Sequence, residues 1–281
     1  MIVPIQKGQQ LLADIASASA SANEFHVWWL GQSGFLVKWQ ENHLLFDPYL
    51  SDSLTKKYAQ SDKPHTRMTE QAIDSASLDM VDVVTSSHNH TDHLDAETLW
   101  QLSIPNPDLK LVLPEANFEF AKSRLGDLAP EFVALNEGST ATVGPFEFHG
   151  IAAAHNEIER DELGRCKFLG FVVKFGEFAI YHSGDTLWHR DLVRQIAPFG
   201  VDLALVPING NKPERRVAGN LDGLEAAAVA KGCGAKMAIP HHFEMFEFNT
   251  ASPEEFVSSC RRFDQPQTVL RCGERFSMKS D

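Results

Sequence analysis

Residues 83–95 read VVTSSHNHTDHLD, so an apolar, β-branched stretch leads directly into three histidines and two aspartates. In extended backbone, side chains two positions apart point to the same side, which brings His88, His90 and Asp92 together. A turn into a following helix would bring His93 back beside them. Neutral imidazoles and carboxylates bind zinc, manganese and iron. The segment therefore predicts a metal site at the end of a buried strand; a solvent-exposed polar loop is the alternative.

Three further polar residues each follow an apolar stretch of strand length. His155 comes after residues 151–154, Asp185 follows the stretch that ends at His182, and His242 follows the one that ends at Pro240. Strand ends can gather side chains from distant parts of a chain on backbone that is held rigidly. We therefore expect these three residues to join the metal site.

Composition limits the class of protein. The chain has 281 residues, 43% of them apolar, which suits one large domain. Its net charge of −13 argues against a nucleic acid polymer as partner. The four cysteines form no C-x-x-C pair, which argues against a disulfide framework and a cysteine zinc site and favours a cytoplasmic location. No apolar stretch is long enough to span a membrane.

The pattern of apolar residues predicts an α+β fold. Strand-length runs occur at 25–30, 34–39, 43–46, 81–86, 110–113, 131–135, 141–143, 146–152, 168–175, 177–182, 201–206, 236–239 and 268–272. Helical spacing occurs near 68–78, 95–103, 116–124, 188–197, 221–231 and 253–263. This order is typical of two packed sheets covered by helices. We expect a single domain over residues 23–281, with an N-terminal helix in residues 1–22 packed on it.

The motifs resemble those of the metallo-β-lactamase superfamily. The order is H-x-H-x-D-H at 88–93, a lone His155, Ser-Gly-Asp at 183–185, and a histidine two residues after Pro240. Four other segments resemble the ascorbate-6-phosphate lactonase-like branch: residues 29–35, 46–50, 182–185 and 207–210. The resemblance implies a four-layer αββα sandwich with a metal site at one edge of its two sheets.

The same resemblance implies two divalent metal ions, zinc or manganese, with iron also compatible. It assigns seven ligands: His88, His90 and His155 to one ion, Asp92, His93 and His242 to the other, and Asp185 as a bridge. His241 competes with His242 for the last position, and the placement after Pro240 favours His242. Asp47 is expected near the metal, where it either orients a ligand or caps a turn. His182 is expected there too, and either orients a ligand or is a core histidine. His241 lies beside them or at the surface.

A basic segment at residues 210–216 stands out on so acidic a chain. Lys212, Arg215 and Arg216 could bind an anionic substrate group, since arginine makes bidentate contacts with phosphate and carboxylate. Asn209 precedes this segment and either contacts the substrate or caps a turn. A solvated surface loop is the more common role for such a segment.

A divalent ion held by histidines keeps a position for a water, whose pKa it lowers toward neutrality. We expect this water, oriented by Asp92 or Asp185, to attack an ester-like bond. The leading prediction is a hydrolase that cleaves a lactone or a carboxylic ester. Its substrate would be small, anionic and sugar-like, phosphorylated or not. A phosphodiesterase acting on a small molecule, lipid head group or nucleotide is the alternative.

Two other classes fit less well. An iron redox protein is disfavoured because the diiron oxygen-reducing branch of the superfamily has a carboxylate where this sequence has His90, and because no flavin domain is evident. An inert binding protein would be expected to have lost ligands, and none of the seven is missing. The sequence leaves open whether the chain forms a homo-oligomer.

Overall fold

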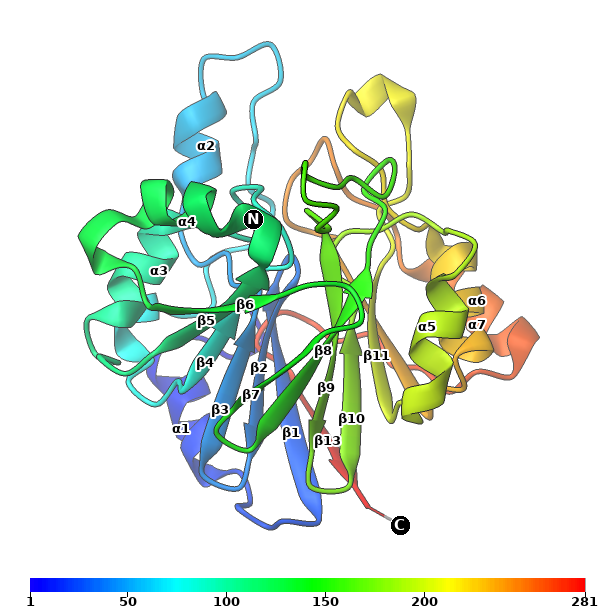
Figure 1. Cartoon of the computed structure of the whole chain (residues 1–281), viewed down its shortest axis with the longest axis horizontal. Helices are drawn as coiled ribbons and strands as arrows, with labels where there is room; N and C mark the ends of the chain where they lie inside the picture. The colour runs from blue at the N-terminus through cyan, green and yellow to red at the C-terminus, as the bar shows by residue number, and fades with distance from the viewer. Residues whose placement is uncertain (281) are drawn as a thin grey trace.

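The computed structural model describes residues 1–280, and within them two β-sheets pack face to face with helices on both outer sides (Figure 1). The first sheet has the order β13-β1-β2-β3-β4-β5-β6. Its strands are β1 (Glu24–Gly31), β2 (Gly34–Trp39), β3 (Asn42–Phe46), β4 (Val83–Thr85), β5 (Lys110–Pro114), β6 (Glu131–Leu135) and β13 (Arg275–Lys279).

The second sheet has the order β12-β11-β10-β9-β8-β7. Its strands are β7 (Thr140–Val143), β8 (Phe146–Ala152), β9 (Leu169–Phe175), β10 (Phe178–His182), β11 (Leu203–Pro207) and β12 (Met237–His241). Aromatic rings join the two sheets: Phe25 of β1 meets the edges of Phe175 and Phe178 at centroid distances of 5.6 and 4.9 Å. Such edge-to-face pairs add to the gain from burying apolar area.

Helices complete the layers (Figure 1). On the side of the first sheet are α1 (Gln9–Ser17), α2 (Ser53–Tyr58), α3 (Ala96–Ser103) and α4 (Phe118–Leu125), and on the side of the second are α5 (Leu192–Ile196), α6 (Gly223–Gly232) and α7 (Glu254–Phe263). Short 3₁₀ turns are η1 (Ser75–Ser77), η2 (Glu115–Asn117), η3 (Gly126–Leu128), η4 (Ala197–Phe199) and η5 (Pro213–Arg215). The predicted α+β sandwich of four αββα layers is confirmed.

The topology brings four strand ends to one end of the sandwich. β3 to β6 run parallel in the first sheet, and β10, β11 and β12 run parallel in the second. Strands β4, β8 and β10 each end three residues before His88, His155 and Asp185, and β12 ends immediately before His242. Residues far apart in sequence are therefore delivered to one rim by rigid backbone.

Two expected elements are wrong. No α-helix forms over 68–78, where η1 is the only helical turn, because this segment bonds to distant backbone: Met68 N–H donates to Met245 O at 2.8 Å. No strand forms over 268–272, where Thr268 N–H donates to Ala238 O at 3.1 Å before the chain turns. The strand β13 begins later, where it can pair with β1.

The N-terminal helix packs on the first sheet. Asp14 of α1 accepts from the Trp28 indole at 2.8 Å, and the Lys38 ammonium donates to the carbonyls of Ile15 and Ala18 at 3.1 and 3.0 Å. The Lys38 ammonium thus adds a donor for carbonyls at the C-terminal end of α1. The division of the chain at residues 22 and 23 stays a prediction. In residues 1–280, no helix has the length and apolar character needed to cross a membrane.

Candidate metal centre

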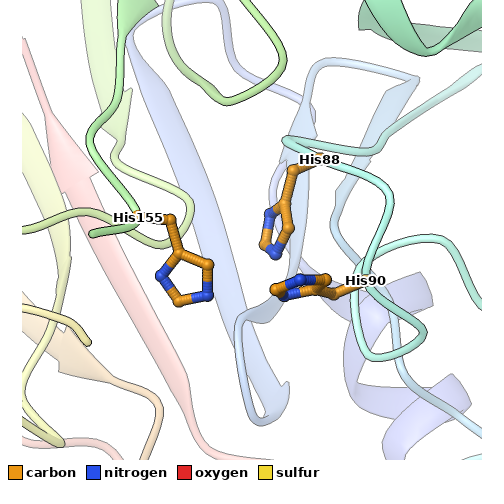
Figure 2. Close-up of side chains that lie close together, drawn as sticks. All are labelled: His88, His90 and His155. Atoms are coloured by element: carbon orange, nitrogen blue, oxygen red, sulfur yellow. The ribbon is translucent and has the colours of Figure 1, made fainter. Parts of the chain in front are cut away.

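Three histidines from two strand ends face a common space (Figure 2). His88 and His90 come from the segment after β4, and His155 follows β8. The ring centroid of His88 lies 4.5 Å from that of His90 and 5.2 Å from that of His155. One nitrogen of each ring lies within 4.8 Å of the others. This spacing matches three ligands of a single ion.

A second group adjoins the first and contains Asp92, His93 and His242. The Asp185 carboxylate lies between the groups. Its Oδ1 is 3.3 Å from His93 Nε2, and its Oδ2 is 3.3 Å from His242 Nε2 and 3.6 Å from His155 Nε2. Asp92 Oδ2 is 3.6 Å from His93 Nε2. The structure thus brings all seven sequence-predicted ligands together; their binding of metal stays a prediction.

Local backbone explains how one short segment supplies four of these side chains. The N–H groups of His93 and Leu94 both donate to His90 O, at 3.1 and 2.8 Å, which turns the chain back on itself. Asp95 then caps α3 by accepting from Thr98 N–H at 3.2 Å. The expected turn into a helix after the histidines is therefore present, and it is this turn that returns His93 to the cluster.

Gly184 makes room for the cluster from the other sheet. Its φ of 57° lies in the left-handed region, and a Cβ there would sit 2.5 Å from Ser87 Cβ. The Ser87 hydroxyl oxygen in turn lies 3.0 Å from His88 Nδ1. Only glycine fits both the backbone angle and this close approach.

Two ligand candidates are oriented by hydrogen bonds from outside the cluster. His93 Nδ1 donates to the buried Asp47 carboxylate at 2.7 Å, which leaves Nε2 facing Asp92 and Asp185. His155 Nδ1 donates to a backbone carbonyl, Gly219 O, at 2.9 Å. Such contacts fix the tautomer so that the other nitrogen is free for a metal ion.

His182 and His241 lie beneath the cluster, outside the groups that could hold a metal ion. The two rings stack in parallel at 5.2 Å, and His182 also stacks on Phe46 at 4.7 Å. His182 Nε2 donates to Ser33 O at 2.9 Å, and both nitrogens of His241 lie 3.3 Å from serine hydroxyls. Both side chains are fully buried in the core next to the cluster. His242, and not His241, faces the carboxylates.

Electrostatics keep the first group of histidines neutral. Burial lowers the pKa of His88 and His90, and it lowers that of His155 to about 4. Burial also lowers the pKa of His93, but the Asp185 and Asp92 carboxylates outweigh it and raise that pKa well above its usual value. Because a ligand must be deprotonated, metal binding at His93 would release a proton.

The chemistry of the cluster suits a divalent cation. Three of its buried ligand atoms make no hydrogen bond in residues 1–280: His88 Nε2, and the ion-paired His93 Nε2 and Asp185 Oδ1, which lie 3.3 Å apart. Buried polar atoms without hydrogen bonds are costly and uncommon in native proteins. Imidazole nitrogens and carboxylate oxygens are ligands for zinc, manganese and iron. The residues present therefore fit the metal ions that the sequence predicts.

A cleft of about 480 Å³ opens above the cluster and is lined by His90, Asp92, His155, Asp185 and His242. Sequence reasoning missed most of its other walls, which include Gln32, Lys57, Tyr58, His65 and Arg124. Gln32 lies in the short turn between β1 and β2. Its amide donates to Asp92 Oδ2 at 2.8 Å, a contact that no local pattern signals.

The four residues predicted to bind substrate do not line this cleft. Arg215 is buried and donates to the carbonyls of Asn209 and Thr250, so it braces the chain behind the cleft wall. Arg216 pairs with Asp62 at 2.8 Å on the surface. Lys212 is exposed, and the Asn209 side chain bonds to other amides. Their role toward substrate stays a prediction.

Known proteins resemble this chain in sequence and in fold. A family model described as "Beta-lactamase superfamily domain" matches residues 42–243, which include all seven ligand candidates. A relative named "UPF0173 metal-dependent hydrolase" from Opitutus terrae is 30% identical over 253 residues, which cover 88% of this chain and 96% of the relative. The chain belongs to the UPF0173 metal-dependent hydrolase family of the metallo-β-lactamase superfamily.

Solved structures support the fold of this UPF0173 hydrolase. Igni18, a metallo hydrolase from Ignicoccus hospitalis, superposes with a TM-score of 0.68 at 18% identity and covers 92% of this chain and 100% of its own. An isothiocyanate hydrolase from Delia radicum gut bacteria gives a TM-score of 0.72 at 17% identity, covering 90% and 99%. At these identities the likeness shows the fold alone. The lactonase-like branch stays a prediction.

Proposed function

We propose that this metal-dependent hydrolase cleaves an ester-like bond, in a lactone or a carboxylic ester, of a small anionic substrate. The observation that carries the proposal is the buried His and Asp cluster, with ligand atoms that make no hydrogen bond, at the floor of a cleft. In this proposal His88, His90 and His155 hold one divalent ion. Asp92, His93 and His242 would hold a second, and Asp185, which lies beside both groups, would serve both ions.

When bound, the ions supply an activated water at neutral pH and stabilise developing negative charge. The residues of the chain would position this water and accept its proton. Asp92 is the more exposed of the two carboxylates, with 17% of its side chain accessible, and it lines the cleft. The Gln32 amide holds Asp92 Oδ2 in place, so Asp92 can orient a water and accept its proton. Asp185 is buried among three histidines and holds the cluster together.

Size and charge support a small anionic substrate. A cleft of about 480 Å³ lies within the range of small-molecule sites. Lys57 and Arg124 line it, whereas its acidic lining consists of Asp92 and Asp185, which belong to the proposed metal centre. The motif resemblance makes a sugar lactone, phosphorylated or not, the first substrate to try. Zinc and manganese are the first metals to try.

A phosphodiesterase is the second candidate. Two adjoining ion sites can clamp the attacking and leaving oxygens of a phosphoryl group. The adjoining groups around His88 and Asp92 and the cations of the cleft wall are consistent with that use. An iron redox protein is less favoured, since His90 stands where the diiron branch has a carboxylate.

The test is hydrolysis of a paired panel by metal-stripped protein reloaded separately with zinc and manganese. The panel contains glucono-1,5-lactone and simple carboxylic esters against bis-p-nitrophenyl phosphate. H88A and D92N should abolish turnover, while H149A, which alters a histidine paired with Glu147 on β8, should not. Ester turnover that disappears on stripping supports the proposal. Turnover of the phosphodiester alone would replace it with the second candidate.

A further inference from the structure

One wall of the cleft is built of aromatic rings that the hydrolytic chemistry does not use. Tyr58 and His65 stack with centroids 4.2 Å apart and planes inclined by only 16°. Phe248 lies against the same His65 ring at 4.5 Å. All three line the cleft and are partly exposed. We call these three residues the aromatic wall.

Three separate pieces of chain form the aromatic wall. Tyr58 ends α2, His65 lies in the segment that follows, and Phe248 comes from the turn after His242. Tyr58 and Phe248 also pack against a small buried cluster formed by Tyr49, Leu54, Met245 and Phe246. The aromatic wall therefore packs on a separate small hydrophobic cluster, and part of its surface is exposed to the cleft.

The His65 ring is held as a neutral aromatic face. Burial lowers its pKa, and its Nδ1 lies 3.1 Å from Lys63 O, to which it donates. This neutral imidazole lies face to face with the Tyr58 ring, so the wall offers the cleft the ring surface that this stack and Phe248 leave uncovered. The three rings therefore carry no charge of their own, although the Lys63 ammonium lies 5.6 Å from the centre of the Phe248 ring.

Two cations flank the cleft beside aromatic rings. Lys57 Nζ lies 5.1 Å from the centre of the Tyr58 ring, and the Arg124 guanidinium lies 4.4 Å from that of Phe120. Arg124 is held there because it donates to the carbonyls of Asn89 and Leu94. No acidic side chain outside the metal centre lines the cleft. An anion would therefore be attracted here despite the net charge of −13.

We propose that the substrate carries a planar conjugated ring with an anionic group, the ring stacking on the aromatic wall and the anion attracted by Lys57 and Arg124. This inference rests on the proposed ester hydrolysis in the same cleft. It selects a conjugated ring in place of the saturated sugar ring that motif resemblance suggests. Offset stacking between aromatic rings adds to area burial, so a saturated ring of equal size and charge should bind about two- to tenfold more weakly.

A matched pair of ligands isolates the ring. Terephthalate and trans-cyclohexane-1,4-dicarboxylate have the same charge and similar size, and their monomethyl esters release the same alcohol. We would measure the Kd of both dianions for the zinc-loaded protein by calorimetry, and the KM of both monomethyl esters and of glucono-1,5-lactone.

Variants with neighbouring controls test each part of the site. Y58L and F248L should remove the preference for the conjugated ring. F199L is the control, because Phe199 also lies against a histidine, His149, at 4.6 Å but outside the cleft. K57Q should weaken both dianions by up to about fivefold. K56Q, which alters a neighbour on α2 that pairs with Glu97, should change neither.

The expected result is a lower Kd for terephthalate that depends on Tyr58 and Phe248 and not on Phe199. Equal or weaker binding of the conjugated ring, or a lower KM for gluconolactone than for the monomethyl terephthalate, would overturn the inference. If no ester is hydrolysed but terephthalate is still preferred through the aromatic wall, the inference stands and the proposed function fails. The two are therefore separable.

Discussion

The most informative single substitution is D47N, which removes a charge from beneath the metal centre without changing shape. Asp47 is fully buried and accepts from His93 Nδ1 at 2.7 Å, from Thr85 Oγ1 at 2.6 Å and from Ser87 N–H at 3.1 Å. An asparagine can still accept two of these bonds, but its NH₂ group would face the Nδ1–H of His93, and both are donors. His93 must then turn or move its proton to Nε2, the atom that faces the carboxylates.

The magnitude follows from these contacts. Loss of a partner that orients a metal-binding histidine typically lowers metal affinity by about 10- to 100-fold. A hydrogen bond to a charged group contributes about 1.5–3 kcal/mol, so unfolding of the metal-free protein should become easier by about that amount. We expect D47N to lower zinc affinity by about 10- to 100-fold and hydrolysis in parallel.

The assay is a zinc titration against a competing chelator, together with urea unfolding of the metal-free protein. D202N is the matched control: Asp202 is also buried and accepts a backbone bond, from Ala179 N–H at 2.8 Å, but contacts none of the cluster histidines. It should lower stability and leave zinc affinity unchanged. If D47N binds zinc as tightly as the unaltered protein, the orienting role of Asp47 is refuted.

Three further predictions concern stability and local packing. Burial lowers the pKa of His43 to about 4 in the folded protein, below its usual value of 6.5. Between these two pH values the unfolded chain binds more protons than the folded one. The free energy of unfolding therefore falls as the pH drops through this window, by up to about 3 kcal/mol. H43Q should lose that part of the pH dependence in urea unfolding at pH 7 and pH 4.5, and an unaltered difference would count against it. G184A should push Ser87 out of place and lower zinc affinity, and a crystal structure of the variant with an unmoved Ser87 would contradict this. R215A should reduce the free energy of unfolding by about 2 kcal/mol, because it removes the donors to the carbonyls of the buried Asn209 and the half-buried Thr250. R216A, whose ion pair is exposed, should not, and equal effects of the two would be the contrary result.

Much of the candidate metal centre could be predicted because strand ends and local spacing bring its side chains together. His88, His90 and Asp92 follow β4 directly, and the turn that returns His93 is encoded within the same few residues. His155 and Asp185 likewise follow apolar runs that are recognisable as strands. Period and strand ends are local properties of the sequence, so they were enough to predict that these side chains come together.

The walls of the cleft could not be predicted in this way. Lys57, His65 and Arg124 lie in segments without a distinctive pattern, and only tertiary packing brings them above the cluster. The basic segment around Arg215 attracted attention because of its charge, yet that guanidinium is used to hold backbone behind the wall. Charge along a sequence does not tell which side of a loop will face the cleft.

The two wrong elements have a similar cause. Residues 68–78 have helical spacing, but the N–H of Met68 and the hydroxyl of Thr69 bond to the segment at 244–245, which favours extended backbone. In the same region Asp74 accepts from Ala76 N–H at 3.1 Å, a local bond that competes with helix formation. Long-range partners of this kind are invisible in a single sequence.

The most direct test of the central claim is metal content measured together with hydrolysis on one preparation. Elemental analysis of the purified protein should give two divalent ions per chain, one for each of the groups around His88 and Asp92, and fewer for H88A but not for H149A. Chelation should abolish ester hydrolysis, and zinc or manganese should restore it. Full hydrolysis by metal-free protein, or unchanged metal content in H88A, would contradict the account.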